Sequence, residues 1–361
     1  MKIPLSKIDI PKDTLDVINS VLTEGKFILG EKTEEFEEKF AKFCDSKHAA
    51  CVSSGTAALF LSLQALGISK GDEVIIPSLS FVATATPILM HNAIPRFAEV
   101  NKKNYTIDPK EIEKQITKKT KGIIPVHLYG HSANMDEILE IAKKNSLFVL
   151  EDSAQAHGAR YKGKMIGSIG DASCFSFYPS KNLTVCGDGG IVVSNNEEII
   201  KKIKVLRDHG REEKYKHKTL GYNLRFNEIQ AAIGLEQLKN LDKYNNARRK
   251  VAKLYNEKIT KLVTKPFEER WTTHVYHMYT IRSKLRDKLK KFLESREIGT
   301  GIHYPIPIHK QPLINSKQRL DITEEICSTT LSLPMFPSLS TKEQDYVIKT
   351  VNQFFEENKN G

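Results

Sequence analysis

The sequence has few cysteines, and their spacing excludes the sites that cysteine usually builds. Five occur among 361 residues, and none forms a Cys-x-x-Cys pair or lies in a cluster with histidine. An odd number at irregular spacing argues against a disulfide framework and against a zinc or iron–sulfur site. We expect no metal, and we interpret the cysteines as small buried hydrophobic residues of a reducing compartment. They are Cys44, Cys51, Cys174, Cys186 and Cys327.

Long hydrophobic runs are also missing. The most apolar stretch, residues 74–90, is interrupted by proline, serine and threonine, so it is too broken to span a bilayer. The first seven residues contain neither an apolar segment nor a small-residue cleavage site. From these two absences we expect a cytoplasmic protein without a membrane partner.

Acidic residues are outnumbered, but the positive charge is not concentrated in one place. The chain has 55 Lys and Arg against 44 Asp and Glu, a formal net charge of +11. Such an excess can indicate nucleic acid, a membrane surface or an anionic substrate. Here the basic residues are scattered, and no aromatic residues interleave with them as stacking platforms. We expect no nucleic-acid partner, and we assign a minority of the charge to attracting a phosphorylated ligand.

The common nucleotide-binding glycine motifs are absent as well. Neither G-x-x-x-x-G-K-[ST] nor G-x-G-x-x-G occurs, so nucleotide hydrolysis and nicotinamide chemistry lose their usual support. What is present is an alternation of short apolar runs, such as 73–77 and 147–152, with helical patterns, such as 33–43 and 57–66. This alternation predicts an α/β fold, with a mostly parallel sheet covered on both faces by helices.

The character of the chain changes near residue 245. A helix rich in Ile, Ala and Leu is predicted over 227–241, and a second, strongly charged helix over 245–259. Beyond residue 262 the predicted strands are shorter and more polar, as at 274–281 and 300–304. We therefore predict a large domain over residues 1–244 and a smaller α+β domain over residues 245–361.

Four residues in the first part suggest a particular chemistry. Gly55 lies between a strand and a helix, where backbone N–H groups can bind a phosphate. Asp152 ends an apolar strand, and Lys181 precedes the glycine-rich turn 187–190. Pyridoxal phosphate (PLP) enzymes hold their cofactor through a lysine amine and pair its pyridine nitrogen with a carboxylate. Ser176 is placed to reach the phosphate. The combination therefore suggests a PLP enzyme.

Each of these signals also has a plain structural interpretation. Gly55 fits an ordinary capped turn, and Asp152 fits a helix cap or a surface carboxylate. Lys181 is one of 55 basic residues, most of which are expected in solvent. Ser176 fits a strand residue bonded to the backbone. Only the combination, in this order along the chain, favours the cofactor.

Motifs along nearly the whole chain resemble the DegT/DnrJ/StrS-type nucleotide-sugar aminotransferases. These are PLP enzymes with the aspartate-aminotransferase fold (fold type I). The resemblance implies a mostly parallel seven-stranded sheet sandwiched by helices. It favours transamination, because the chain keeps the lysine that dehydratase members replace with histidine. The matching segments are 27–30, 36–37, 54–59, 71–77, 81–84, 125–130, 151–158, 175–190, 221–225 and 229–232.

The resemblance also implies roles for individual residues. Lys181 would bind PLP covalently and then move the proton between the substrate carbon and the cofactor. The other implied cofactor-binding residues are Asp152 for the pyridine nitrogen, Gln155 for the ring hydroxyl, Phe81 for the ring face, and Gly55, Thr56 and Ser176 for the phosphate. Asn223 would reach the phosphate bound to the partner subunit, which implies a homodimer with shared active sites.

The resemblance implies glutamate as the amino donor and a nucleotide-linked keto or deoxy sugar as the acceptor, as in polysaccharide biosynthesis. The run 301–312 is similar to the subgroup that acts on 3-keto sugars, so we expect amination at C3. Tyr304 and His309 are candidates for sugar contact, and Arg211 or Lys214 for the diphosphate. A proline-stiffened surface loop and a solvated charge run are the structural alternatives.

Other functions stay open. The same chemistry could act on a 4-keto nucleotide sugar or a cyclitol, or the chain could be an aromatic-forming dehydratase. A PLP-binding regulator without turnover is a different class, although no helix-turn-helix module is appended. Nucleic-acid binding is suggested by the charge alone and would require salt-sensitive DNA binding.

Overall fold

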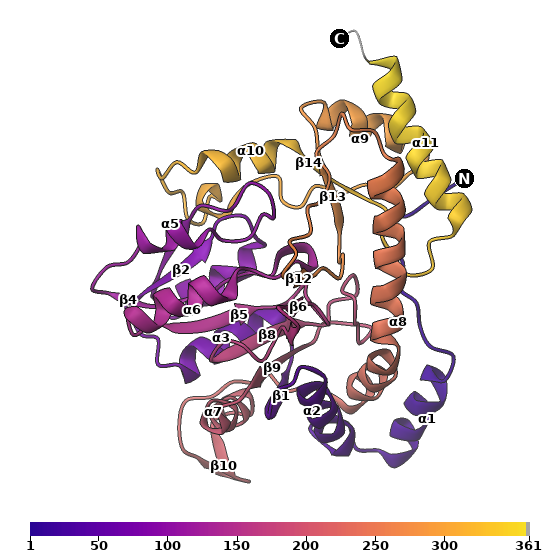
Figure 1. The fold of residues 1–361 in the computed structure, drawn as a ribbon. Coiled ribbons are helices and arrows are strands. Elements are labelled where there is room, and N and C mark those ends of the chain that lie inside the picture. The colour runs from indigo at the N-terminus through magenta and orange to yellow at the C-terminus, as the bar shows by residue number, and fades with distance from the viewer. Residues whose placement is uncertain (359–361) are drawn as a thin grey trace.

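A computed structural model describes residues 1–358 (Figure 1). Its centre is a seven-stranded sheet in which only β9 runs antiparallel to its neighbours, β1 and β8. This arrangement confirms the predicted α/β fold with a mostly parallel sheet. In spatial order the strands are β1 (His48–Val52), β9 (Gly190–Ser194), β8 (Ala172–Ser176), β5 (Phe148–Asp152), β4 (Thr120–Ile123), β2 (Glu73–Pro77) and β3 (Ile94–Ala98).

Helices cover both faces of this sheet because alternate side chains of each strand point to opposite faces. Ile75, Val149 and Val193 pack in one hydrophobic core, whereas their chain neighbours pack in the other. The first core also contains residues of α2 (Glu31–Phe43), α5 (Pro109–Glu113), α6 (Met135–Lys144) and α8 (Glu228–Lys258). The second contains residues of α3 (Gly55–Ala65), α4 (Thr86–Met90) and α7 (Glu197–Arg207).

The first half of α8 is joined to α2 by a buried carboxylate. Glu228 accepts hydrogen bonds from the backbone N–H groups of Gly30, Lys32 and Thr33, at 2.9, 2.8 and 3.0 Å. The Thr33 hydroxyl also donates to it. The first N–H groups of a helix have no acceptor within the helix, so a residue almost 200 positions away caps α2.

The predicted break between two helices at residue 245 is wrong, because α8 is one continuous helix of 31 residues. Asn245 is buried inside it rather than at a helix start, with its side-chain amide donating to His157 O at 2.8 Å and accepting from Asn182 at 2.8 Å. The change in composition marks the point where α8 leaves the sheet and meets other partners. The predicted domain boundary at 244/245 lies within this helix and stays a prediction.

The C-terminal part is built on α8 and a two-stranded antiparallel ribbon, β13 (Tyr279–Arg282) and β14 (Thr330–Leu333). Helices α9 (Arg286–Glu294), α10 (Asp321–Thr329) and α11 (Thr341–Glu357) complete it. The expected strand over 274–281 begins only at Tyr279, and 300–304 forms a single bridge at Gly301. Ile3 is buried in this C-terminal core and bridges to Ile298, so the N-terminus lies beside α11 (Figure 1).

The remaining elements lie around the sheet. Helix α1 (Thr14–Glu24) packs against α8, and the hairpin of β10 (Arg211–Glu213) and β11 (Lys216–His217) lies beyond α7 at the lower edge of Figure 1. A small sheet contains β12 (Thr272–Thr273), β6 (Arg160–Tyr161) and β7 (Lys164–Met165). Short 3-10 turns are η1 (Val82–Thr84), η2 (Leu128–Gly130) and η3 (Ile308–Lys310).

The cysteines and the apolar segments can be compared with what the sequence predicted. All five cysteines are free thiols, four of them buried and Cys186 exposed. Across residues 1–358, none of the helices combines the length and the apolar character that crossing a membrane needs.

Candidate active site

A pocket of about 460 Å³ opens at the carboxyl ends of β2, β5 and β8. This is the edge at which open parallel sheets usually bind ligands. Eight residues singled out in the sequence line it together, although they are far apart in the chain: Gly55, Thr56, Phe81, Asp152, Gln155, Ser176, Lys181 and Tyr304. The predicted residues therefore meet in one cavity.

One end of the pocket is suited to an anion. Ser54 caps α3, with its hydroxyl accepting from Ala57 N at 3.0 Å, and Gly55 and Thr56 follow in the first turn. Their N–H groups have no acceptor within the helix, and the helix dipole favours a negative charge here. A Cβ atom on Gly55 would lie 2.8 Å from Cβ of Ser176, so only glycine allows the two segments this close approach. This end of the pocket could therefore hold a phosphate.

Lys181 lies on the loop that follows β8, where its backbone N–H bonds Tyr178 O at 2.8 Å. Burial lowers the pKa of its amine to about 8, and the negative charge of Asp152 partly opposes that shift. An amine with this pKa has a far larger neutral fraction near physiological pH than an ordinary lysine, and only the neutral form attacks a carbonyl carbon. Most other lysines of the chain are exposed to solvent.

Asp152 ends β5 and is buried at the floor of the pocket. Burial raises the pKa of its carboxyl, while bonds from the Thr84 hydroxyl (2.8 Å) and from Ala154 N (3.2 Å) act in the opposite direction. The positive charge of Lys181 also favours the ionised form. A desolvated carboxylate held in this way is able to pair with a protonated ring nitrogen.

Three further side chains surround the space between the anion end and Asp152. Phe81 is 55% exposed, and its ring centroid lies 5.9 Å from that of Tyr304. Gln155 accepts a bond from Tyr129 N at 2.8 Å and donates one to the Tyr304 hydroxyl at 3.0 Å. Its amide orientation is therefore determined by two partners, and its second N–H remains for a ligand.

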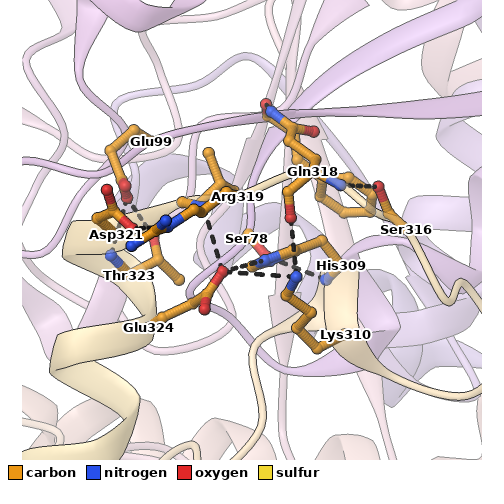
Figure 2. Close-up of polar contacts among 12 residues, drawn as sticks. Ser78, Glu99, His309, Lys310, Ser316, Gln318, Arg319, Asp321, Thr323 and Glu324 are labelled. Atoms are coloured by element: carbon orange, nitrogen blue, oxygen red, sulfur yellow. Dashed lines mark hydrogen bonds and ion pairs between the residues drawn. The ribbon is translucent and has the colours of Figure 1, made fainter.

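His309 does not line this pocket, and its predicted contact with the sugar stays a prediction. The ring is fully buried, with Nδ1 2.6 Å from Ser78 Oγ and Nε2 3.1 Å from Glu324 Oε1 (Figure 2). Both nitrogens are thus occupied within the protein. The structural alternative of an exposed surface loop does not hold for this ring, which joins its loop to the residue that follows β2.

The two other predicted contacts lie outside the lining of this pocket. Arg211 is at the start of β10 and forms an ion pair with Asp208. The Asn223 side chain is exposed and accepts a bond from Arg225 Nε at 3.1 Å. Their predicted roles at the diphosphate and in a partner's site remain predictions.

Among the other residues that line the pocket, the polar side chains of Ser80, Thr84 and His303 received no role from the sequence. Thr84 ends the matching segment 81–84, in which only Phe81 received a role. His303 lies beside Tyr304. Each of these two residues could have been found from its closeness in sequence to a predicted site residue, Phe81 for Thr84 and Tyr304 for His303.

The arrangement fits pyridoxal phosphate. The cofactor has an anionic phosphate, a flat aromatic ring, a basic ring nitrogen and an aldehyde that reacts with an amine. The pocket offers a helix N-terminus with Ser176, the face of Phe81, the carboxylate of Asp152 and the amine of Lys181 in one cavity.

Comparisons with known proteins agree with this chemistry. The model of the DegT/DnrJ/EryC1/StrS aminotransferase family matches residues 9–352. A dTDP-3-amino-3,6-dideoxy-alpha-D-galactopyranose transaminase of Aneurinibacillus thermoaerophilus is 42% identical over 346 residues, which are 95% of each chain. A pleiotropic regulatory protein of Geobacillus stearothermophilus is 41% identical over 351 residues, 95% of this chain and 94% of that protein.

Solved structures show the same similarity in three dimensions. The crystal structure of S. venezuelae DesV in complex with a ketimine intermediate superposes with a TM-score of 0.96 at 38% identity, covering 98% of this chain and 99% of that one. Other similar structures contain PMP, the amine form of PLP.

Proposed function

The chain belongs to the DegT/DnrJ/EryC1/StrS aminotransferase family, and from that premise we propose that it transfers an amino group from glutamate to C3 of a nucleotide-linked keto sugar. That it is a PLP-dependent sugar aminotransferase follows from the family and its relatives. The observation that best supports catalysis is the amine of Lys181, with its pKa lowered to about 8, in one pocket with Asp152.

The residues divide the work between binding and proton transfer. The first turn of α3 and Ser176 would hold the phosphate, Phe81 would cover the ring, and Asp152 would keep the ring nitrogen protonated. Bound PLP supplies an electron sink for the negative charge that develops on the substrate carbon. Lys181 would remove the proton from that carbon and deliver it to the cofactor. A pKa near the working pH suits a group that both accepts and donates a proton.

The Lys181 role is tested by absorbance spectra of the purified protein before and after glutamate is added. Wild type should show a visible band that glutamate bleaches, and Lys181→Ala should lose the band or its response to glutamate. Lys164→Ala, which removes an exposed lysine on β7, is the matched control and should behave like wild type. A colourless wild type that takes up no PLP would refute the proposed chemistry.

Amination at C3 is supported by the name of the Aneurinibacillus relative, a 3-amino sugar transaminase. It is also supported by the position of Tyr304, from the run 301–312, in the pocket. The test is turnover of purified enzyme with glutamate and matched 3-keto and 4-keto sugar nucleotides, with a keto-inositol as a third acceptor. If only the 4-keto sugar nucleotide is converted, the acceptor is a 4-keto sugar and the C3 proposal is wrong. If only the keto-inositol is converted, the acceptor is a cyclitol.

A homodimer with shared sites is the proposed assembly, because Asn223 is exposed outside its own pocket. Lys181→Ala and Asn223→Ala should each be inactive alone. When the two variants are unfolded, mixed and refolded together, activity should return. One site of each mixed dimer would then contain both wild-type residues. Activity of Asn223→Ala alone at the wild-type level would contradict a role in catalysis across the interface.

A regulatory function is the second candidate, because one relative is named a pleiotropic regulatory protein. The two functions differ in turnover. Multiple turnovers with glutamate and any keto sugar would establish the enzyme, whereas cofactor binding without turnover on the whole acceptor panel would favour the regulator.

A further inference from the structure

A chain of two hydroxyl groups leads from the pocket wall to the Asp152 carboxylate. Ser80 Oγ lies 2.8 Å from Thr84 Oγ1, and Thr84 Oγ1 lies 2.8 Å from Asp152 Oδ2. All three side chains are almost fully buried, at 4%, 1% and 5% exposure, and all three line the pocket. Ser80 and Thr84 flank Phe81 in sequence, so one short turn, which includes η1, carries both the ring-facing phenyl group and the hydroxyl pair.

The direction of these hydrogen bonds follows from counting protons. An ionised carboxylate only accepts hydrogen bonds, so the single hydroxyl proton of Thr84 is donated to Asp152. Ser80 must then donate its own proton to Thr84. The other oxygen of Asp152 accepts from Ala154 N at 3.2 Å. The carboxylate is thus held at both oxygens, and the Ser80 bond polarises the Thr84 hydroxyl toward it.

Such support is needed because burial works against the charge of Asp152. Burial raises the pKa of this carboxyl, and the Thr84 hydroxyl is the strongest of the influences that lower it, ahead of Ala154 N–H, Lys181 and His127. A carboxyl that became protonated would no longer keep a ring nitrogen protonated.

We propose that Thr84, supported by Ser80, is a positioning residue that keeps the Asp152 carboxylate ionised and fixed in orientation for the cofactor ring. The inference rests on the proposed function and extends it to two residues that act through Asp152. A purely structural role fits less well, because the Thr84 hydroxyl bonds no backbone group and its backbone N–H is already bonded to Phe81 O at 3.0 Å.

The test measures the protonation of the ring nitrogen in holoenzyme loaded with ¹⁵N-labelled PLP. Thr84→Val keeps the shape of the side chain and removes the hydroxyl. We expect its ¹⁵N resonance to move toward that of an unprotonated pyridine, and its glutamate half-reaction to slow about tenfold. Thr84→Ser, which retains the hydroxyl, should restore both readouts.

Two further variants make the result specific. Thr350→Val removes a buried threonine hydroxyl in α11, where it bonds Tyr346 O at 2.7 Å, and should change neither readout. Ser80→Ala should give a smaller shift of the ¹⁵N resonance in the same direction. If Thr84→Val does not fold, the resonance of Ser80→Ala tests the inference in its place. A wild-type resonance in Thr84→Val, or in Ser80→Ala in that case, overturns the inference. A wild type that takes up no PLP would instead refute the proposed function.

Discussion

Two residues of the pocket carry pKa shifts that determine its chemistry. Burial lowers the pKa of Lys181 to about 8 and raises that of Asp152, and the charge of each partly offsets the shift of the other. The sequence indicated both residues through their neighbours. It could not indicate the shifts, because these depend on how many atoms the fold packs around each group.

The lowered pKa of Lys181 predicts how the protein captures its cofactor. Only the neutral amine attacks the aldehyde, so the rate of PLP capture by cofactor-free protein should rise with pH and level off above about 8. An ordinary lysine would give a rate that continues to rise toward about pH 10. Stopped-flow absorbance at a series of pH values measures this profile. A midpoint near that of free lysine would show that the amine is solvated.

The Tyr304 hydroxyl is predicted to serve the acceptor sugar rather than glutamate. Burial holds the pKa of Tyr304 well above its ordinary value, so the group stays a phenol. Its oxygen accepts from Gln155, which leaves its proton free for a ligand. Tyr304→Phe should therefore raise the KM of the keto sugar about tenfold and change the glutamate half-reaction by less than about threefold.

The two half-reactions can be followed separately in stopped flow. Tyr346→Phe is the control, since its hydroxyl bonds Arg296 O in the C-terminal part. Equal losses in both half-reactions would show that Tyr304 acts on the cofactor instead of the sugar.

Among the elements, α2 is predicted to depend on a residue that is not part of it. Glu228→Ala would remove the acceptor of three backbone N–H groups of the 30–33 segment. We expect the free energy of unfolding to fall by about 2–4 kcal/mol, since unsatisfied, partly buried donors are costly. Urea denaturation measures this loss. Glu38→Ala, an exposed glutamate on α2, should change it by less than about 0.5 kcal/mol, and similar losses in both variants would contradict the capping role.

Elements with a strong local pattern could be predicted, and those set by distant contacts could not. The sequence predicted α2 from the spacing of its apolar residues, and it predicted the strand that ends at Asp152. The continuity of α8 through residue 245 could not be predicted, because Asn245 is held there by His157 and Asn182, which are remote in sequence. The burial of His309 could not be predicted for the same reason, since Ser78 and Glu324 are remote in sequence.

For the whole molecule, buried histidines predict sensitivity to mild acid. Burial lowers the pKa of His131 and His303 to about 4 and of His157 to about 3, from an ordinary value of 6.5. His274 and His277 are lowered for the same reason. As pH falls below 6.5, the unfolded chain binds protons that the native one does not. The free energy of unfolding should therefore decrease, by up to about 1.4 kcal/mol per pH unit for each such histidine.

Urea midpoints between about pH 7.5 and 4.5 measure this slope before most carboxylates titrate. His157→Gln should reduce it, whereas His217→Gln, which changes an exposed histidine, should leave it unchanged. Stability that stays constant over this range would show that the histidines become protonated without unfolding.

The bridge between Ile3 and Ile298 limits the order in which the chain can fold during synthesis on the ribosome. Ile3 emerges long before Leu331 and Phe354, which belong to the core that buries it. Every strand of the central sheet leaves the exit tunnel earlier than these residues. Ile3 therefore cannot reach its place in this core until the segment that contains Phe354 has also left the tunnel.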